Sequence, residues 1–252
     1  MKQLVRAFLN KCGIEIRLVK NMHAQLRDAF LEQQRLVGKK DVKVVFDIGA
    51  YDGGTALKYK EYFPNATVYS FEPFAATYSK LLNTANKHSF IKPINAAVAE
   101  KVGHAILHVN SMDATNSLLP SETTNSYLDD LTKSVDRVEV QTTTVDYLCE
   151  EKNIDCIDVL KIDVQGNGLA VLKGAERMLR EKKIKIIYIE IEFLQIYKGQ
   201  PLMYELTAFL SGFNYNLFGL YNLVHQKSGQ LAWGDAIYYC DELESSIRSM
   251  NS

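Results

Sequence analysis

The sequence predicts an α/β fold built on a doubly wound, mostly parallel sheet. Short runs rich in Val and Ile, with the length of buried strands, alternate with segments of helical period. The first run ends in a glycine-rich turn that leads into a helix, and the same alternation resumes after a polar middle segment. Strands joined by helices in this way pair in parallel, and such sheets bind ligands outside the carboxyl ends of their strands.

The N-terminal part predicts a helical extension at residues 1–40, ahead of a domain at residues 41–245. Residues 1–20 are basic and amphipathic, which is typical of a helix packed on a domain or of one lying on a membrane surface. A single short signal of this kind favours packing over peripheral membrane contact. Leu26, Phe30 and Leu36 continue a helical period, so we expect a helical cap.

The first half of the domain predicts three strands separated by helices. We expect strands at residues 42–48, 67–71 and 90–98, and helices at residues 55–62 and 75–86. A Pro-Asn pair after residue 63 ends the first helix.

The second half begins with alternating residues around a Ser-, Thr- and Asn-rich loop at residues 110–134, which indicates antiparallel strands. The parallel order then resumes, and a hairpin with a turn at residues 227–230 closes the chain. We expect antiparallel strands at 105–109 and 137–145, later strands at 157–164 and 184–193, helices at 169–180 and 202–210, and hairpin arms at 214–221 and 236–240.

Composition limits the classes of partner. The 252 residues include 29 Lys plus Arg and 30 Asp plus Glu, a balance that gives no field to hold nucleic acid. The 4 cysteines show no C-x-x-C pair. No apolar stretch approaches the roughly 20 residues of a transmembrane helix. We therefore expect a cytoplasmic protein without a structural metal, while the oligomeric state stays open.

Two strand ends predict a nucleoside cofactor. The first strand ends in the glycine turn at residues 47–54, and Glu72 follows 25 residues after Asp47, where such folds place the acid that binds a ribose diol. Tyr51 replaces the second glycine of the G-x-G-x-x-G dinucleotide fingerprint, and its side chain would obstruct a pyrophosphate. This argues against the alternative of a nicotinamide oxidoreductase.

Four motifs occur in the order of a known family: VFDIGAYDG at residues 45–53, FEP at 71–73, LKIDVQG at 160–166 and VLKGA at 171–175. With them the chain resembles the FkbM-type S-adenosylmethionine-dependent methyltransferases, over about residues 42–213, and the hairpin motif WGDA is also similar. The resemblance implies a Rossmann-like methyltransferase fold whose last strand runs antiparallel. It also implies methyl transfer from S-adenosyl-L-methionine, usually to oxygen, and we expect a hydroxyl of a small molecule, sugar, glycan or secondary metabolite as acceptor.

The resemblance also assigns cofactor-binding residues. They line the methionine part, the ribose, the adenine or the sulfonium, and are Asp47, Gly49, Ala50, Gly53, Glu72, Pro73, Ala96, Ala97 and Asp163. Gly168 departs from the family pattern, since relatives most often carry an acid at this position. A degenerate member that binds cofactor or glycan without turnover is therefore the alternative function.

Methyl transfer to a hydroxyl needs a base, and the sequence offers carboxylates at two strand ends. Asp163 is the first candidate, because burial at the end of a strand could raise its pKa, although such an acid can equally be a helix cap. Glu190 and Glu192 share one face of the next strand and could supply a base or join Asp163 around a divalent cation. We expect Asp163 and Glu190 to be catalytic, with no metal.

Other polar residues are weaker candidates. His104, His108 and His225 could act as bases, but scattered histidines are more often at the surface. Asn116 and Ser117, in the polar loop, resemble a serine-bearing segment of the family and could touch cofactor or acceptor, or simply form turns. Trp233 could stack on a sugar, although a lone Trp more often packs in a core.

Overall fold

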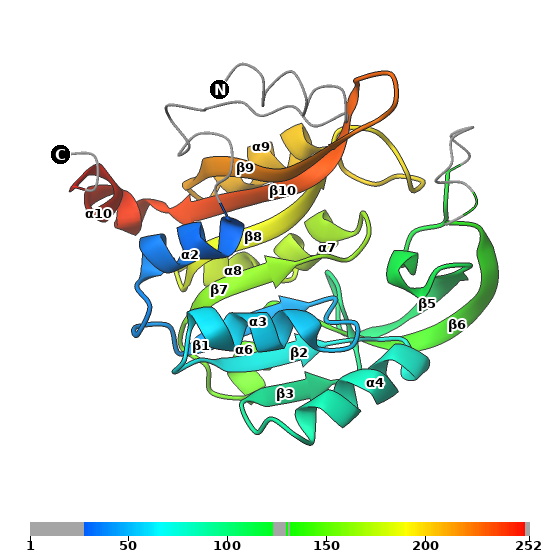
Figure 1. The fold of residues 1–252 in the computed structure, drawn as a ribbon, viewed down its shortest axis with the longest axis horizontal. Coiled ribbons are helices and arrows are strands. Elements are labelled where there is room, and N and C mark those ends of the chain that lie inside the picture. The colour runs from blue at the N-terminus through cyan, green and yellow to red at the C-terminus, as the bar shows by residue number, and fades with distance from the viewer. Residues whose placement is uncertain (1–27, 123–129, 131, 250–252) are drawn as a thin grey trace, which may run out of the picture.

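The computed structural model describes residues 28–122, 130 and 132–249 and shows an α/β architecture (Figure 1). Its main sheet has seven strands in the order β3-β2-β1-β7-β8-β10-β9. These strands are β1 Val44–Ile48, β2 Thr67–Phe71, β3 Ile91–Ile94, β7 Ile157–Ile162, β8 Ile184–Glu192, β9 Tyr215–His225 and β10 Leu231–Cys240. The glycine turn follows β1, which lies next to β7 at the point where the strand order reverses. Doubly wound folds bind their ligands at this point.

The main sheet is parallel except for β10. The pairs of β1 with β2 and β7, of β2 with β3 and of β7 with β8 are all parallel. β10 runs antiparallel to both β8 and β9. The predicted fold class is confirmed, including a reversed strand in the terminal hairpin.

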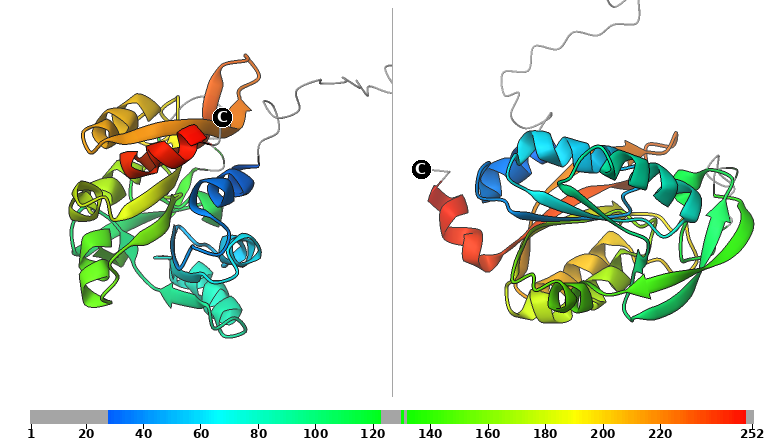
Figure 2. Two further views of the ribbon diagram at one scale, coloured as in Figure 1. Left: turned by 90° about the vertical axis from the view of Figure 1, so that its left-hand side faces the viewer. Right: turned by 90° about the horizontal axis from the view of Figure 1, so that it is seen from below.

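Helices cover both faces of the main sheet, as the second view of Figure 2 shows, with α2, α3 and α4 on one face and α6 to α9 on the other. They are α2 Ala29–Val37, α3 Gly54–Tyr62, α4 Ala75–Ala85, α6 Val145–Glu151, α7 Gly168–Lys173, α8 Glu176–Arg180, α9 Met203–Ser211 and α10 Glu244–Ser249. Since side chains of a strand alternate between faces, Phe46 and Leu160 join one apolar cluster while Val45 and Val159 join the other.

A second sheet stands beyond the carboxyl ends of the first strands (Figure 1). It contains β4 Ala97–Val98, β5 Gly103–Asn110 and β6 Ser134–Thr143 in the order β4-β6-β5. β5 and β6 are antiparallel, as the alternation predicted, and Leu107 and Val140 pack in a small cluster of their own. This sheet gives the site at the strand ends a second wall.

Several elements differ from the expectations, among them α10, which was not predicted. The strand expected at residues 90–98 is two strands, β3 and β4, which belong to different sheets. The helix expected at residues 169–180 is divided into α7 and α8 at Gly174, where a Cβ atom would lie 2.2 Å from the carbonyl oxygen of Ala99. Helix α6 was not predicted, although Thr144 caps it by accepting a hydrogen bond from the Tyr147 N–H.

The N-terminal extension is described only from residue 28, and α2 forms the part of the cap that the structure describes. The amphipathic segment at residues 1–20 lies outside the described residues. Within the described chain, no helix combines the length and the apolar character needed to cross a bilayer.

Candidate functional site

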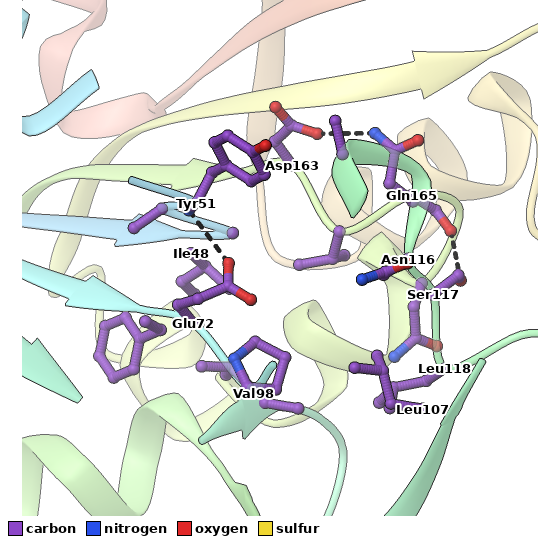
Figure 3. Close-up of a pocket in the computed structure, with 18 of the residues that line it drawn as sticks. Ile48, Tyr51, Glu72, Val98, Leu107, Asn116, Ser117, Leu118, Asp163 and Gln165 are labelled. Atoms are coloured by element: carbon purple, nitrogen blue, oxygen red, sulfur yellow. Dashed lines mark hydrogen bonds between the residues drawn. The ribbon is translucent and has the colours of Figure 1, made fainter. Parts of the chain in front are cut away.

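A cavity of about 540 Å³ opens at the carboxyl ends of β1, β2 and β7. Its far wall comes from β4, β5 and the segment from Asp113 to Leu118, so the main sheet and the small sheet enclose it together (Figure 3). The volume lies in the usual range of small-molecule sites, and the position is the one expected for a parallel sheet.

The glycine turn forms the floor of this cavity. The N–H groups of Gly49 and Ala50 both donate to the carbonyl oxygen of Phe71, at 3.1 and 2.9 Å, which ties the turn to the end of β2. Gly49 has φ +79°, and a Cβ atom there would lie 1.8 Å from the carbonyl oxygen of Asp163. Only glycine fits where the ends of β1 and β7 approach this closely.

Glu72 faces the cavity from the end of β2, with a side chain held in place by its neighbours. It accepts hydrogen bonds from the Tyr51 N–H at 3.0 Å, the Phe74 N–H at 3.0 Å and the Thr77 hydroxyl at 2.7 Å. Burial raises the pKa of Glu72, and these three donors oppose that shift. Because carboxylate oxygens offer about four acceptor positions, Glu72 retains room for a further donor from a ligand.

A buried lysine connects the carboxylates at the ends of β1 and β7. The Lys161 ammonium lies 3.1 Å from Asp47 and 3.6 Å from Asp163, and it donates to the Gly49 carbonyl at 2.9 Å. Burial alone would lower the pKa of Lys161, but the charges of Asp47 and Asp163 outweigh burial and raise it, so the ammonium stays charged. Burial raises the pKa of Asp47, and the adjacent ammonium opposes this.

Asp163 faces the cavity, and its side chain is 43% exposed. The sequence predicts burial of this residue at the strand end, but in the structure its side chain points away from the core, toward the cavity. Its neighbours on β8 are two further carboxyl groups with raised pKa values. Burial and the charge of Asp163 raise the pKa of Glu192 to about 8, and burial raises that of Glu190 well above its usual range.

Gln165 links Asp163 to Glu190. Its Nε2 donates to Asp163 and to Glu190, at 3.0 Å each, and its Oε1 accepts from the Tyr197 hydroxyl at 3.2 Å. Its backbone oxygen accepts from the Ser117 hydroxyl at 2.7 Å (Figure 3). Gln165 has φ +52°, an uncommon conformation for a residue with a side chain, and this network of contacts holds it there.

The segment from Asp113 to Leu118 covers the cavity from the small sheet. Asn116 and Ser117 both line it, as the comparison with the family's serine-bearing segment suggested. The Asn116 Oδ1 accepts from the Asn110 N–H at 2.7 Å, whereas its buried Nδ2 has no hydrogen-bond partner among the described residues. An unpaired buried donor in a cavity wall fits an acceptor atom of a bound ligand.

Most of the predicted cofactor residues meet at this cavity. Its lining includes Gly49, Ala50, Glu72, Pro73, Ala96, Ala97 and Asp163. Asp47 lies behind the turn, fully buried against Lys161. Gly53 does not line the cavity: it faces Leu81 and Thr84 of α4, with φ +88°. Glu190 lies behind Gln165 and reaches the cavity only through that amide.

Lys161 is the functional candidate that the sequence argument missed. It stands in a run of buried apolar residues, and a lysine is almost never fully buried without a carboxylate partner. That pattern alone pointed to a charged partner on a neighbouring strand, and Asp47 is the register partner of Lys161.

The remaining weaker candidates, the histidines and Trp233, lie away from the cavity, whose described lining contains no histidine. His104 is exposed on β5 and His225 is exposed at the end of β9, as expected, but His108 is buried, and burial lowers its pKa. Trp233 is half-buried on β10. At Gly168 a Cβ atom would meet Ile189 at 3.0 Å, so this position faces the apolar core.

Comparison with known families shows which family the chain belongs to. A family model described as the Methyltransferase FkbM domain matches residues 47–217. The chain belongs to the FkbM methyltransferase family. FkbM methyltransferases take their methyl group from S-adenosylmethionine, which is therefore the cofactor of this family member.

Two curated methyltransferases are similar in sequence. The "2-O-methyltransferase NoeI" of Sinorhizobium fredii is 24% identical over 183 residues, covering 69% of this chain and 74% of the relative. "Methyltransferase 1" of Beauveria bassiana is 25% identical over 181 residues, covering 62% and 70%. Among solved structures, the precorrin-6y C5,15-methyltransferase of Geobacter metallireducens is similar with a TM-score of 0.46 and 12% identity, covering 90% of this chain and 95% of that one.

The residues of the cavity fit the FkbM cofactor. Asp52, Glu72, Asp113 and Asp163 contribute four carboxyl groups to the lining, and Lys161 is the one basic residue in its described part. This excess of acid suits a ligand with a sulfonium and an ammonium group. A carboxylate at the end of β2 suits the ribose hydroxyls, and the unpaired Asn116 amide suits a ring nitrogen.

Proposed function

We propose that the protein transfers a methyl group from S-adenosylmethionine to a hydroxyl of a sugar, glycan or other polyhydroxylated small molecule. The observation that carries the proposal is the exposed carboxylate of Asp163 in a cavity that matches the family's cofactor. The name of the Sinorhizobium relative, a 2-O-methyltransferase, supports oxygen as the acceptor atom.

Methyl transfer to a hydroxyl requires the protein to align the acceptor oxygen with the methyl group and to provide one acceptor for the hydroxyl proton. S-adenosylmethionine supplies an electrophilic methyl group when it is bound. Asp163 accepts the proton of the acceptor hydroxyl as the new oxygen–carbon bond forms, and Lys161 and Gln165 hold its carboxylate in place. Glu190 does not line the cavity and meets Asp163 only through the Gln165 amide, and burial raises its pKa; it therefore supports Asp163 through Gln165 rather than acting as the base.

The charge of the cavity selects among acceptors. Its lining carries four carboxyl groups against one ammonium, so an acceptor with a phosphate or carboxylate would meet like charge at close range. We therefore expect neutral glycosides to be methylated and their phosphorylated counterparts to be rejected.

The test is methyl transfer from labelled S-adenosylmethionine to a panel of neutral glycosides, each paired with its phosphate ester. Asp163→Asn tests the base. We expect this variant to bind S-adenosylhomocysteine and to lose at least about 100-fold in turnover, the usual scale of general-base catalysis. Cofactor binding without turnover on any hydroxyl acceptor would contradict the proposal and favour the cofactor- or glycan-binding alternative.

A further inference from the structure

We infer that Lys161 is a positioning residue that fixes the cofactor turn and the carboxylate of Asp163 together. The inference rests on the proposed function, because it assigns a second task to the site described above. It starts from the four oxygen atoms that surround one ammonium group. These belong to the side chains of Asp47 and Asp163 and to the carbonyls of Ile48 and Gly49.

Neutralising Asp47 is not enough to explain this arrangement. Asp47 is the register partner of Lys161 on β1, and its carboxylate at 3.1 Å already satisfies the need of a buried lysine for a counter-charge. The ammonium nevertheless also donates to the Gly49 carbonyl at 2.9 Å and reaches Asp163 at 3.6 Å. Gly49 and Asp163 both line the cavity, on different strands.

A backbone hydrogen bond from the Asp163 N–H to the Ile48 carbonyl, at 3.0 Å, already joins the two strand ends, and Lys161 adds contacts to the Gly49 carbonyl and to the Asp163 side chain. Gly49 begins the turn that forms the cavity floor, and Asp163 follows the end of β7. A charged hydrogen bond to a carbonyl is stronger than a neutral one. Lys161 thus restrains the Gly49–Ala50 peptide and at the same time attracts the Asp163 carboxylate toward the floor.

Lys161 is also the one cation among the acids around Asp163 in the described chain. Four acids surround Asp163: Asp47 on β1, Glu190 and Glu192 on β8, and Asp235 on β10. Tyr188 and Tyr197 lie beside these acids. The Gln165 amide is neutral. Without Lys161, every charged group around Asp163 in the described chain would be an acid.

A second lysine provides a matched comparison. Lys185 on β8 pairs with Asp158 at 2.7 Å, and Asp158 also accepts from the N–H groups of Lys43 and Val44. This pair lies at the beginning of the strands and does not line the cavity. It is an ion pair between neighbouring strands without any contact to the site.

The experiment uses the full chain in three variants. Lys161→Met alone would leave Asp47 buried and unpaired, which is strongly destabilising, so the informative variant is Asp47→Asn with Lys161→Met. Lys161→Arg keeps the charge and tests rescue, and Lys185→Met is the control. S-adenosylhomocysteine affinity is measured by calorimetry, and methyl transfer is measured against pH.

We expect the double variant to bind S-adenosylhomocysteine about tenfold more weakly and to change the acid side of its pH–rate profile, because the cation 3.6 Å from Asp163 is lost. Lys161→Arg should restore the profile in part, and Lys185→Met should leave both readouts unchanged. A double variant that is folded, binds with unchanged affinity and keeps the pH profile would overturn the inference. Weakened cofactor binding in a protein that methylates no hydroxyl acceptor would support the positioning of the turn and contradict the proposed function instead.

Discussion

At the scale of single residues, the site depends on side chains whose position is set by several partners at once. Glu72 illustrates this, because the same carboxylate that faces the cavity also accepts from two backbone N–H groups and from Thr77. Such a residue has two roles, one in ligand binding and one in holding the loop that follows β2. The substitutions that test it must therefore distinguish a loss of affinity from a loss of stability.

We predict that Glu72→Ala weakens S-adenosylhomocysteine binding by about 1.5–3 kcal/mol, the usual value of a charged hydrogen bond. It should also lower the unfolding free energy, since its three donors lose their acceptor. Glu72→Gln keeps an acceptor for the local donors and should lose mainly affinity. Calorimetry and thermal unfolding measure the two effects, with Glu61→Ala on the exposed side of α3 as control. Unchanged affinity in a folded Glu72→Ala protein would contradict the ribose assignment.

We also predict that activity needs no divalent metal. The Gln165 amide stands between Asp163 and Glu190 and donates to both at 3.0 Å, so a donor occupies the place where an ion would need oxygen ligands. The described residues contain no group of three or more His, Cys, Asp or Glu placed to hold an ion. The measurement is turnover after EDTA treatment. A loss that Mg²⁺ restores would show that Asp163 is a ligand rather than the base.

At the scale of elements, the sequence predicted most of the sheet because its strands are short, apolar and separated by clear turn residues. β2 was predicted with its observed bounds, and β1 and β7 nearly so. Prediction failed where a tertiary contact sets the boundary. Periodicity alone does not show that Gly174 must pass close to the Ala99 carbonyl, which divides α7 from α8, nor that residues 95 and 96 carry the chain from one sheet to another.

The same limit applies to the site. The motifs placed Gly49, Glu72 and Asp163 at one edge of the sheet because parallel strands end together, and the cavity contains all three. The role of Gly53 did not follow, because which glycine faces the ligand and which faces α4 depends on the path of the turn. The link from Asp163 through Gln165 to Glu190 depends on a positive φ that no spacing rule shows.

The glycine turn gives a prediction at this scale. Gly49→Val should abolish S-adenosylhomocysteine binding, because its Cβ would meet the Asp163 carbonyl at 1.8 Å while φ stays near +79°. Gly229→Ala in the β9–β10 turn is the matched control, since Gly229 has φ +87° but nothing within 4 Å of a Cβ. We expect the control to lose only about 1 kcal/mol of stability, from strain, and to bind normally. A folded Gly49→Val protein with normal affinity would refute the site.

At the scale of the whole molecule, the buried carboxyl groups determine how stability depends on pH. Burial raises the pKa values of Asp47, Glu72, Glu190 and Asp235, and raises that of Glu192 to about 8. An acid whose pKa is higher in the folded state than in the unfolded chain makes the folded state bind more protons between the two values. Stability then falls as pH rises through that window.

We therefore predict that the free energy of unfolding decreases from about pH 5 to about pH 8, at up to about 1.4 kcal/mol per pH unit for each such group. His108 acts in the opposite direction, since burial lowers its pKa and its contribution grows as pH rises through its unfolded value. Its single contribution opposes those of five acids.

Glu192→Gln isolates one of these acids, because an amide imitates the protonated carboxyl. At pH 5 the wild-type Glu192 is already protonated, so the variant should have nearly the same stability. At pH 8.5 the wild-type side chain carries a buried charge beside Asp163, and the variant should be the more stable protein. Denaturant unfolding at both pH values measures the difference. Parallel stability curves for the two proteins would contradict the prediction. They would mean that Glu192 ionises in the folded state as easily as in water, so that neither burial nor the charge of Asp163 raises its pKa.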